Sequence, residues 1–277
     1  MKILVLNGSP RKNGNTAACG EEKRMNRPYT VCYLNVSAEA HIDGDFGKLP
    51  EAKPGSAVFR SRWHDFKADA IIYGATTMAL FTEGFDPELP KAQTVYARED
   101  YIAPCDVGRY YIAISPNEHI AYASNLMPDI RGRGVHGIIH ALTENVSDDY
   151  LAYLREKRIS YIFCGSEVFD PVIMMRKAYA LFGVKKAILS GGAYADWTML
   201  SRGLIDEIQV MYLPVVDGDP RSNTLFRRME GEPSVPVALR LVNAQIVDGD
   251  GLLVTYKPKN IREEQENENR HSSDSAE

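Results

Sequence analysis

The sequence predicts an α/β fold, with a mostly parallel sheet flanked by helices and an antiparallel C-terminal end. Strand-length runs of Ile, Val, Tyr and Ala alternate with helix patterns between about residues 28 and 257. Such runs are typical of strands buried on both faces, and their alternation with helices implies right-handed crossovers between parallel strands. The last two strands instead flank Asp248-Gly249-Asp250-Gly251, which favours a hairpin.

The individual elements follow from local signals. Ser147 can cap a helix whose first turn carries Asp148 and Asp149, which are favourable at the positive end of the helix dipole. Gly183 and Gly203 are typical of helix C-terminal ends. Helices are therefore predicted after Ser147, over 169–182 and over 193–202. Strands are predicted over 30–37, 70–74, 110–115, 137–143, 159–165, 186–190, 207–216, 239–247 and 252–257.

Composition excludes several classes of function. The formal net charge of the 277 residues is −5 and the basic residues are scattered, which disfavours binding to nucleic acid or to an anionic membrane surface. No apolar run approaches the roughly 18 residues of a membrane span, and no signal peptide is visible. Four distant cysteines (Cys19, Cys32, Cys105, Cys164) predict free thiols in the cytoplasm and no metal site.

Three segments differ in composition. Residues 25–257 form the predicted domain, and residues 258–277 are charged and nearly free of aliphatic side chains, so a disordered tail is expected. Residues 1–24 are expected to be an N-terminal extension. Its "LNGSPRKNGNT" resembles the FMN-phosphate loop of flavodoxin-like NADPH-dependent FMN reductases, but the segment is far too short for that fold and is interpreted as a remnant.

Two predicted strands end in phosphate-binding patterns. "ADAIIYGATTM" places Thr76 and Thr77 shortly after Gly74, and "KKAILSGGAYADWTML" places Gly191 and Gly192 before a helix. Glycines allow close backbone approach, and N–H groups at a helix start favour anions. Ligands of open α/β sheets bind outside the carboxyl ends of the strands, so two such ends predict a dinucleotide site.

These segments, together with "RPYTVCYLNVSAEAHIDGDF" and "GLIDEIQVMYLPVVDGD", resemble the reductase domain of riboflavin biosynthesis, the RibD C-terminal type, over about residues 26–257. The resemblance implies a dihydrofolate-reductase-like fold and usually a homodimer. It further implies NADPH-dependent hydride transfer to a C=N or C=O carbon of a small pyrimidine-like or pteridine-like substrate. The implied substrate in riboflavin biosynthesis is 5-amino-6-(5-phosphoribosylamino)uracil.

The resemblance also assigns roles to residues. It implies that Asn35 and Ser37 bind substrate and that Asp43, or less favourably Glu39, supplies the proton that accompanies the hydride. The implied cofactor-binding residues are Gly74, Thr76, Thr77, Gly165, Ser166, Ser190, Gly191, Gly192 and Ala193. The choice between NADPH and NADH stays open at this point.

The chain departs from the family pattern in the loop after the first strand. The usual S-x-D-G is replaced by Ser37-Ala38-Glu39-Ala40, and alanine at a turn that needs a positive φ would cost on the order of 1 kcal/mol. Tyr33 and Ser190 stand where biosynthetic enzymes tend to carry lysine and glutamate. Two alternatives therefore stay open: a reductase-like nucleotide-binding protein without activity, and an FMN-dependent reductase.

Overall fold

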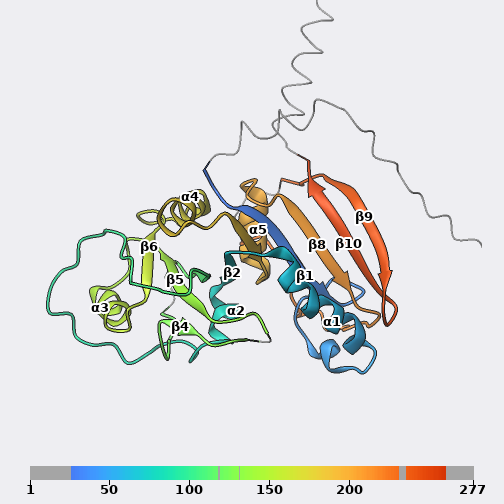
Figure 1. Cartoon of the computed structure of the whole chain (residues 1–277), viewed down its shortest axis with the longest axis horizontal. Coiled ribbons are helices and arrows are strands. Elements are labelled where there is room, and N and C mark those ends of the chain that lie inside the picture. Colours follow the sequence, from blue (N-terminus) through green and yellow to red (C-terminus); the bar gives the residue numbers. More distant parts are fainter. Residues whose placement is uncertain (1–25, 118, 131, 231–234, 260–277) are drawn as a thin grey trace, which may run out of the picture.

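The computed structural model describes residues 26–117, 119–130, 132–230 and 235–259, drawn as the coloured ribbon in Figure 1. The predicted N-terminal extension, with its FMN-type loop, lies outside the described residues, as does the predicted tail from residue 260 on. Pro258, the first residue of that predicted tail, is the last residue of a strand.

Ten strands in the described part of the chain form one sheet. Their order is β4-β5-β3-β2-β7-β1-β8-β10-β9, and β6 pairs with β5. The strands are β1 (Tyr29–Val36), β2 (Ala70–Gly74), β3 (Tyr110–Ile114), β4 (Leu126–Met127), β5 (His136–Leu142), β6 (Ser160–Phe163), β7 (Lys186–Leu189), β8 (Glu207–Tyr212), β9 (Leu239–Val247) and β10 (Gly251–Pro258).

The pairing confirms the predicted sheet. Strand β1 is parallel to both β7 and β8, and β2 is parallel to both β7 and β3. Strand β5 is parallel to β3 and β6, whereas β10 is antiparallel to β8 and β9. The carboxyl ends of β1, β7, β2, β3, β5 and β6 therefore share one edge of the sheet. The short antiparallel strand β4 was not predicted.

The helices and the two short 3-10 helices, η1 and η2, connect these strands. Their bounds are η1 (Asp45–Lys48), α1 (Ala52–Ser61), η2 (Arg62–Phe66), α2 (Ala75–Ala79), α3 (Asp148–Glu156), α4 (Pro171–Phe182) and α5 (Ala193–Ser201). The predictions of α3, α4 and α5 are confirmed. Helix α1 was missed because Pro54 and Gly55 lie in its first turns and hide it from a propensity argument.

Local signals explain the helix ends. The Ser147 hydroxyl accepts the N–H of Tyr150 at 3.2 Å, which confirms it as the cap of α3. Asp170 caps α4 by accepting the N–H of Val172 at 2.9 Å, so this helix begins at Pro171 and not at the predicted residue 169. Gly183 ends α4 in the left-handed conformation, with a φ of 67°.

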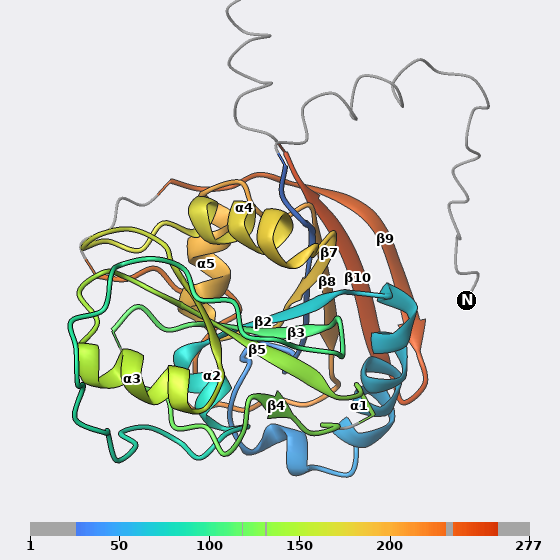
Figure 2. The same ribbon diagram turned by 60° about the vertical axis from the view of Figure 1, so that its left-hand side comes forward.

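The helices cover the two faces of the sheet unequally. Helices α1, α2 and α3 bury side chains in one core cluster, which includes Phe59, Met78 and Leu151. Helices α4 and α5 bury Met174 and Met199 in the cluster on the opposite face. Figure 2 shows the two groups of helices on opposite sides of the strands. None of the helices in the described ranges is long and apolar enough to cross a membrane.

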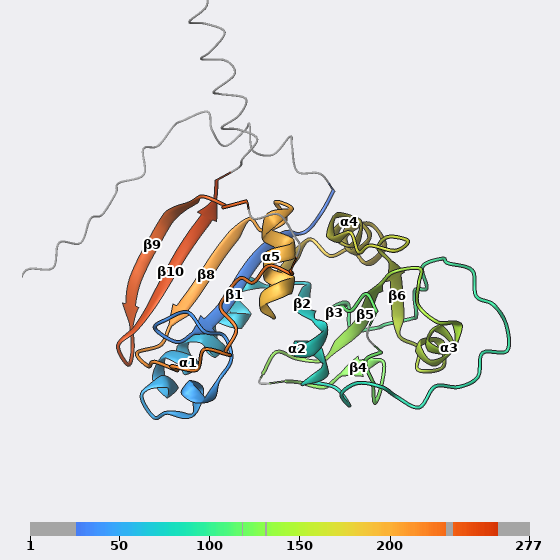
Figure 3. The same cartoon turned by 180° about the vertical axis from the view of Figure 1, so that it is seen from behind.

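Strand β9 lies at the outer edge of the sheet and is exposed from Leu239 to Ile246 (Figure 3). Apolar side chains are among the exposed ones: Leu241 is 55% exposed, Val242 46% and Ile246 75%. An exposed apolar edge of this length invites association with another surface.

Candidate functional site

The predicted glycine turn forms where β2 and β7 end side by side. The N–H of Gly74 donates to the carbonyl of Gly191 at 2.9 Å, and the N–H of Ser190 donates to that of Ile72 at 3.1 Å. The peptide bond between Gly191 and Gly192 is cis. Two segments more than a hundred residues apart in sequence therefore meet at the carboxyl edge of the sheet, as the sequence predicts.

Both strands lead directly into helices at this turn. Gly74 precedes α2 and Gly192 precedes α5, which starts at Ala193. A Cβ atom placed on Gly192 would lie 3.4 Å from the Thr77 hydroxyl oxygen, so α2 and the glycine turn are in contact. Thr76, in the same helix, is exposed. The N–H groups at the start of α5 have no intrahelical acceptors, which makes this position suitable for an anionic group.

Gly165 and Ser166 follow β6 at the same edge of the sheet, but β5 and β3 separate β6 from β2. The N–H of Glu144 donates to the carbonyls of both Gly165 and Ser166 at 3.1 Å. With a strand spacing of about 4.8 Å, the turn after β6 lies about 14 Å from the end of β2 and about 19 Å from the end of β7 along the edge. The structure therefore places this pair on the edge of the predicted site but not in contact with the glycine turn.

The loop after β1 is packed against residues 213–225. The carbonyl of Ala40 accepts the N–H of Leu225 at 3.1 Å, and the N–H of Ala38 donates to Val215 at 2.8 Å. Ser37 is fully buried, and its hydroxyl oxygen accepts the N–H of His41 at 3.1 Å. The Ser37 side chain thus stabilises the turn and does not line the pocket described below.

The two predicted proton donors, Glu39 and Asp43, both bind residues of the segment 213–225. Glu39 accepts the N–H groups of Asp217 and Gly218 at 2.6 and 2.8 Å. The hydrogen bond from the Ser37 hydroxyl, followed by that from Gly218, lowers the pKa of Glu39 from 4.5 to about 2. Glu39 is therefore ionised near neutral pH, which opposes a role as proton donor.

Asp43 is exposed, and its carboxylate binds one residue twice. It accepts the backbone N–H of Asn223 at 2.6 Å and the side-chain amide of Asn223 at 2.7 Å. Its neighbours Ile42 and Gly44 line a pocket, whereas Asp43 itself does not.

The departure at Ala40 has the predicted backbone conformation. Ala40 has a φ of 70°, in the left-handed region that favours glycine. We expect Ala40→Gly to stabilise the folded chain by about 1 kcal/mol, because it relieves this strain. The measurement is the free energy of unfolding in urea. Ala38 lies two residues earlier in the same loop and has no positive φ, so Ala38→Gly should not stabilise the chain. Stabilisation by both substitutions would contradict the explanation.

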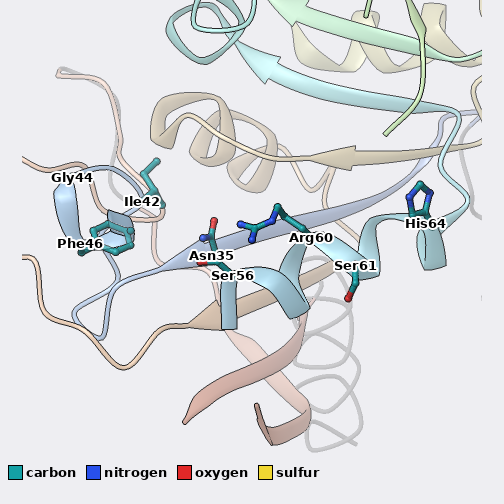
Figure 4. Close-up of a pocket in the computed structure, with 9 residues that line it drawn as sticks. Asn35, Ile42, Gly44, Phe46, Ser56, Arg60, Ser61 and His64 are labelled. Atoms are coloured by element: carbon teal, nitrogen blue, oxygen red, sulfur yellow. The ribbon is translucent and has the colours of Figure 1, made fainter. Parts of the chain in front are cut away.

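A pocket of about 860 Å³ opens beside the carboxyl end of β1 (Figure 4). The loop after β1 forms one wall, and α1 and η2 form the other. Nine residues line it: Asn35, Ile42, Gly44, Phe46, Gly47, Ser56, Arg60, Ser61 and His64. Of the residues that the sequence assigns to substrate binding, Asn35 lines this pocket and Ser37 does not.

The lining of the pocket is basic and polar. The guanidinium group of Arg60 extends toward Asn35 in Figure 4, and His64 lies one helical turn further along the chain. None of the nine lining residues is acidic. Arg60 has no ion-pair partner among the residues that the structure describes. Such a lining suits a ligand that carries a negative charge.

Sequence reasoning missed the wall contributed by α1 and η2. Ser56, Arg60 and Ser61 come from α1 and His64 comes from η2. Neither helix was predicted, so these residues had no assigned position beside the strand ends. The spacing of Arg60 and His64, four residues apart, places both on one side of a helical run and could have indicated a shared surface. Their distance from Asn35 in sequence gives no hint of contact.

Other candidate groups in the described ranges are structural. His140 is fully buried: its Nδ1 is paired with the Tyr122 hydroxyl at 2.8 Å, and burial lowers its pKa to about 3. No group of three or more His, Cys, Asp or Glu side chains among the described residues is placed to hold a metal ion. Cys32, Cys105 and Cys164 are free thiols.

A family model and two curated relatives match this chain. A model of the family described as "RibD C-terminal domain" matches residues 33–253. The chain is 28% identical over 240 residues to the 2,5-diamino-6-ribosylamino-4(3H)-pyrimidinone 5′-phosphate reductase of Methanothermobacter thermautotrophicus, covering 84% of this chain and 99% of the relative. A protein of the same name from Aquifex aeolicus is 31% identical over 87 residues, which are 31% of this chain and 38% of the relative.

Solved structures show the same fold. A pyrimidine reductase-like protein from Corynebacterium diphtheriae superposes with a TM-score of 0.60 at 18% identity, covering 85% of this chain and 93% of the other. The riboflavin biosynthesis reductase of Saccharomyces cerevisiae superposes with a TM-score of 0.51 at 13% identity, covering 87% and 95%. At these identities, the likeness concerns the fold.

Proposed function

Because the chain belongs to the RibD C-terminal domain family, we propose that it is an NADPH-dependent reductase of a phosphorylated ribosylaminopyrimidine in riboflavin biosynthesis. One observation carries the proposal: the glycine turn and the basic pocket lie on adjacent strands. The Ser190 hydroxyl donates to the carbonyl of Tyr33 at 3.0 Å, and Asn35 lines the pocket two residues further along β1. A cofactor at the turn and a substrate in the pocket would therefore meet above β1 and β7.

The glycine turn suits a nicotinamide dinucleotide. The N–H groups at the start of α5 and the hydroxyl groups of Thr76 and Thr77 would hold its diphosphate, while Gly74, Gly191 and Gly192 allow close approach of the backbone. Gly165 and Ser166 lie further along the same edge, where the other end of an extended dinucleotide would pass. When bound, the nicotinamide supplies the hydride, and the protein supplies orientation and a shielded pocket.

The pocket favours a phosphorylated pyrimidine over a pteridine. Arg60 and His64 would bind the phosphate, and the Asn35 amide can both donate to and accept from a pyrimidine ring. A basic lining without a carboxylate does not suit a cationic ring. The sequence resemblance implies the uracil compound, whereas the curated relatives are named for its 2,5-diamino counterpart. Both are substrates to test.

Asp43 does not line the pocket, so the proton that accompanies the hydride is assigned to water in the pocket, with Asp43 as the nearby group that exchanges protons with this water. Asp43 is exposed and flanked by two residues of the pocket wall, so it could exchange protons with solvent. Glu39 is assigned a scaffold role, since its low pKa keeps it ionised.

Fluorescence of NADPH tests the proposal directly. We expect the purified chain to oxidise NADPH when either the 2,5-diamino pyrimidinone ribosyl phosphate or the uracil analogue is added, and to discriminate between the two. NADH in place of NADPH tests the cofactor assignment. A chain that binds NADPH but reduces neither compound would support the nucleotide-binding alternative. A yellow, flavin-containing preparation would revive the FMN alternative.

We also propose that the chain acts as a homodimer in the cytoplasm. Ile246, Leu252 and Tyr212 face one another in register across β9, β10 and β8. Ile246 is 75% exposed and Leu252 39% exposed, which leaves an apolar row uncovered in the single chain. A second copy of the chain would bury this face. Free thiols suit a reducing compartment.

We expect Ile246→Lys to convert the dimer to a monomer in sedimentation velocity, because a buried, unpaired ammonium group strongly opposes association. Gln245→Lys is the matched control, since Gln245 is also exposed on β9 but pairs with Leu253 on the opposite face. A monomeric wild-type chain would contradict this interface. So would a Gln245→Lys variant that is monomeric while Ile246→Lys stays dimeric.

A further inference from the structure

Beneath the glycine turn, α5 carries a buried carboxyl group, that of Asp196, with no exposed surface. Its Oδ1 accepts the backbone N–H of Gly191 at 3.2 Å. Its own N–H donates to the carbonyl of Gly192 at 3.0 Å. One residue therefore binds both glycines of the turn, Gly191 through its side chain and Gly192 through its backbone.

The surroundings of the Asp196 carboxyl group disfavour its charged form. Burial raises the pKa of Asp196 well above its usual range, and the single hydrogen bond from Gly191 opposes this shift without cancelling it. Its Oδ2 has no hydrogen-bond partner among the described residues. Cys32, which interacts with it electrostatically from β1, is a fully buried thiol whose pKa is also raised by burial. Surroundings that favour the neutral form also reduce the repulsion of an anionic ligand on the turn.

The turn is held from the opposite side as well. The N–H of Gly74 donates to the carbonyl of Gly191 at 2.9 Å, so the backbone of Gly191 is fixed through both its N–H and its carbonyl group. Two consecutive glycines would otherwise be the most flexible backbone at this edge of the sheet. Freezing them before a ligand arrives reduces the entropy that binding must overcome.

We propose that Asp196 is a positioning residue for the cofactor, because its carboxyl group holds the Gly191 amide and thereby fixes the turn that receives the NADPH diphosphate. This inference rests on the proposed function. Asp196 does not itself touch the ligand, so its loss changes cofactor binding more than the chemical step. The KM for NADPH rises while kcat at saturating NADPH falls much less.

The test compares four forms of the full chain: wild type, Asp196→Ala, Asp196→Asn and Ser201→Ala. We expect Asp196→Ala to weaken NADPH binding by about tenfold in calorimetry, because it removes the hydrogen bond to Gly191. Asparagine is neutral and keeps an oxygen acceptor, so Asp196→Asn should restore most of the affinity. Ser201→Ala changes an exposed hydroxyl at the far end of α5, where it donates to Thr198, and controls for effects on the helix itself.

The outcomes separate the inference from the function on which it rests. A wild-type chain that does not bind NADPH overturns the proposed function and the positioning role together. Equal NADPH affinity in wild type and a folded Asp196→Ala overturns the positioning role alone, as does a loss in kcat without a rise in KM. If Asp196→Ala does not fold, Asp196→Ser replaces it, because its shorter hydroxyl cannot reach Gly191 and the same comparison with Asp196→Asn applies.

Discussion

Replacing Arg60 with alanine is expected to raise the KM for the phosphorylated pyrimidine by about 30-fold, equivalent to about 2 kcal/mol of lost binding energy. Arg60 extends into the pocket, where a phosphate would receive charge-assisted hydrogen bonds from its guanidinium group. The measurement is steady-state kinetics at saturating NADPH. Because the phosphate is remote from the reacting carbon, kcat should fall less than kcat/KM.

The dephosphorylated substrate makes this test specific. If Arg60 binds the phosphate, Arg60→Ala should have little effect on the KM for the compound without phosphate, although that KM is already high in the wild type. Lys53→Ala is the matched control, because Lys53 is an exposed cation of the same helix that does not line the pocket. Equal losses with and without the phosphate would show that Arg60 acts elsewhere.

Gly165→Ala is expected to destabilise the folded chain by about 3 kcal/mol. Gly165 has a φ of 123°, and a Cβ atom there would lie 2.0 Å from the backbone oxygen of Val168. Neither the left-handed conformation nor the backbone clash can be relieved without moving the turn after β6. The free energy of unfolding in urea measures the loss, and NADPH affinity should fall with it if this turn contacts the cofactor.

Gly84→Ala separates the two causes. Gly84 has a φ of 87°, but a Cβ atom there would meet nothing within 4 Å. It should therefore cost only the backbone strain, about 1 kcal/mol. If the two variants lost equal stability, the contact with Val168 would not be the reason for glycine at position 165.

The central strands could be predicted because they bury both faces, and the exposed strand β9 could be predicted because a hairpin signal follows it. β2 and β9 have the predicted bounds, and the Asp-Gly-Asp-Gly hairpin joins β9 to β10 as expected. Helix α1 could not be predicted, because its stability comes from packing against β1 and β8 and not from its own propensity. A Cβ atom on Gly55 would lie 2.8 Å from a Leu213 side-chain carbon, which shows how closely α1 approaches the segment after β8.

Some features of the candidate site could be predicted from the sequence and others could not. The glycine turn was predictable, because a strand that ends in glycines before a helix has a meaning that is local in sequence. The environments of Glu39 and Asp43 were not predictable, because each carboxylate binds a partner that is distant in sequence. Glu39 binds the backbone at Asp217, nearly 180 residues away in sequence, and Asp43 binds Asn223.

The sequence alone determined the α/β fold, the two glycine-bearing strand ends and the strained position of Ala40, since periodicity and backbone conformation are properties of short segments. Only the tertiary structure revealed that α1 supplies the basic wall of the pocket, that the predicted acids are bound to a distant loop, and that Asp196 is buried under the glycine turn. These features depend on which segments the sheet brings together. Desolvation and hydrogen bonding then set the charge of each group, and neither can be read from its sequence neighbours.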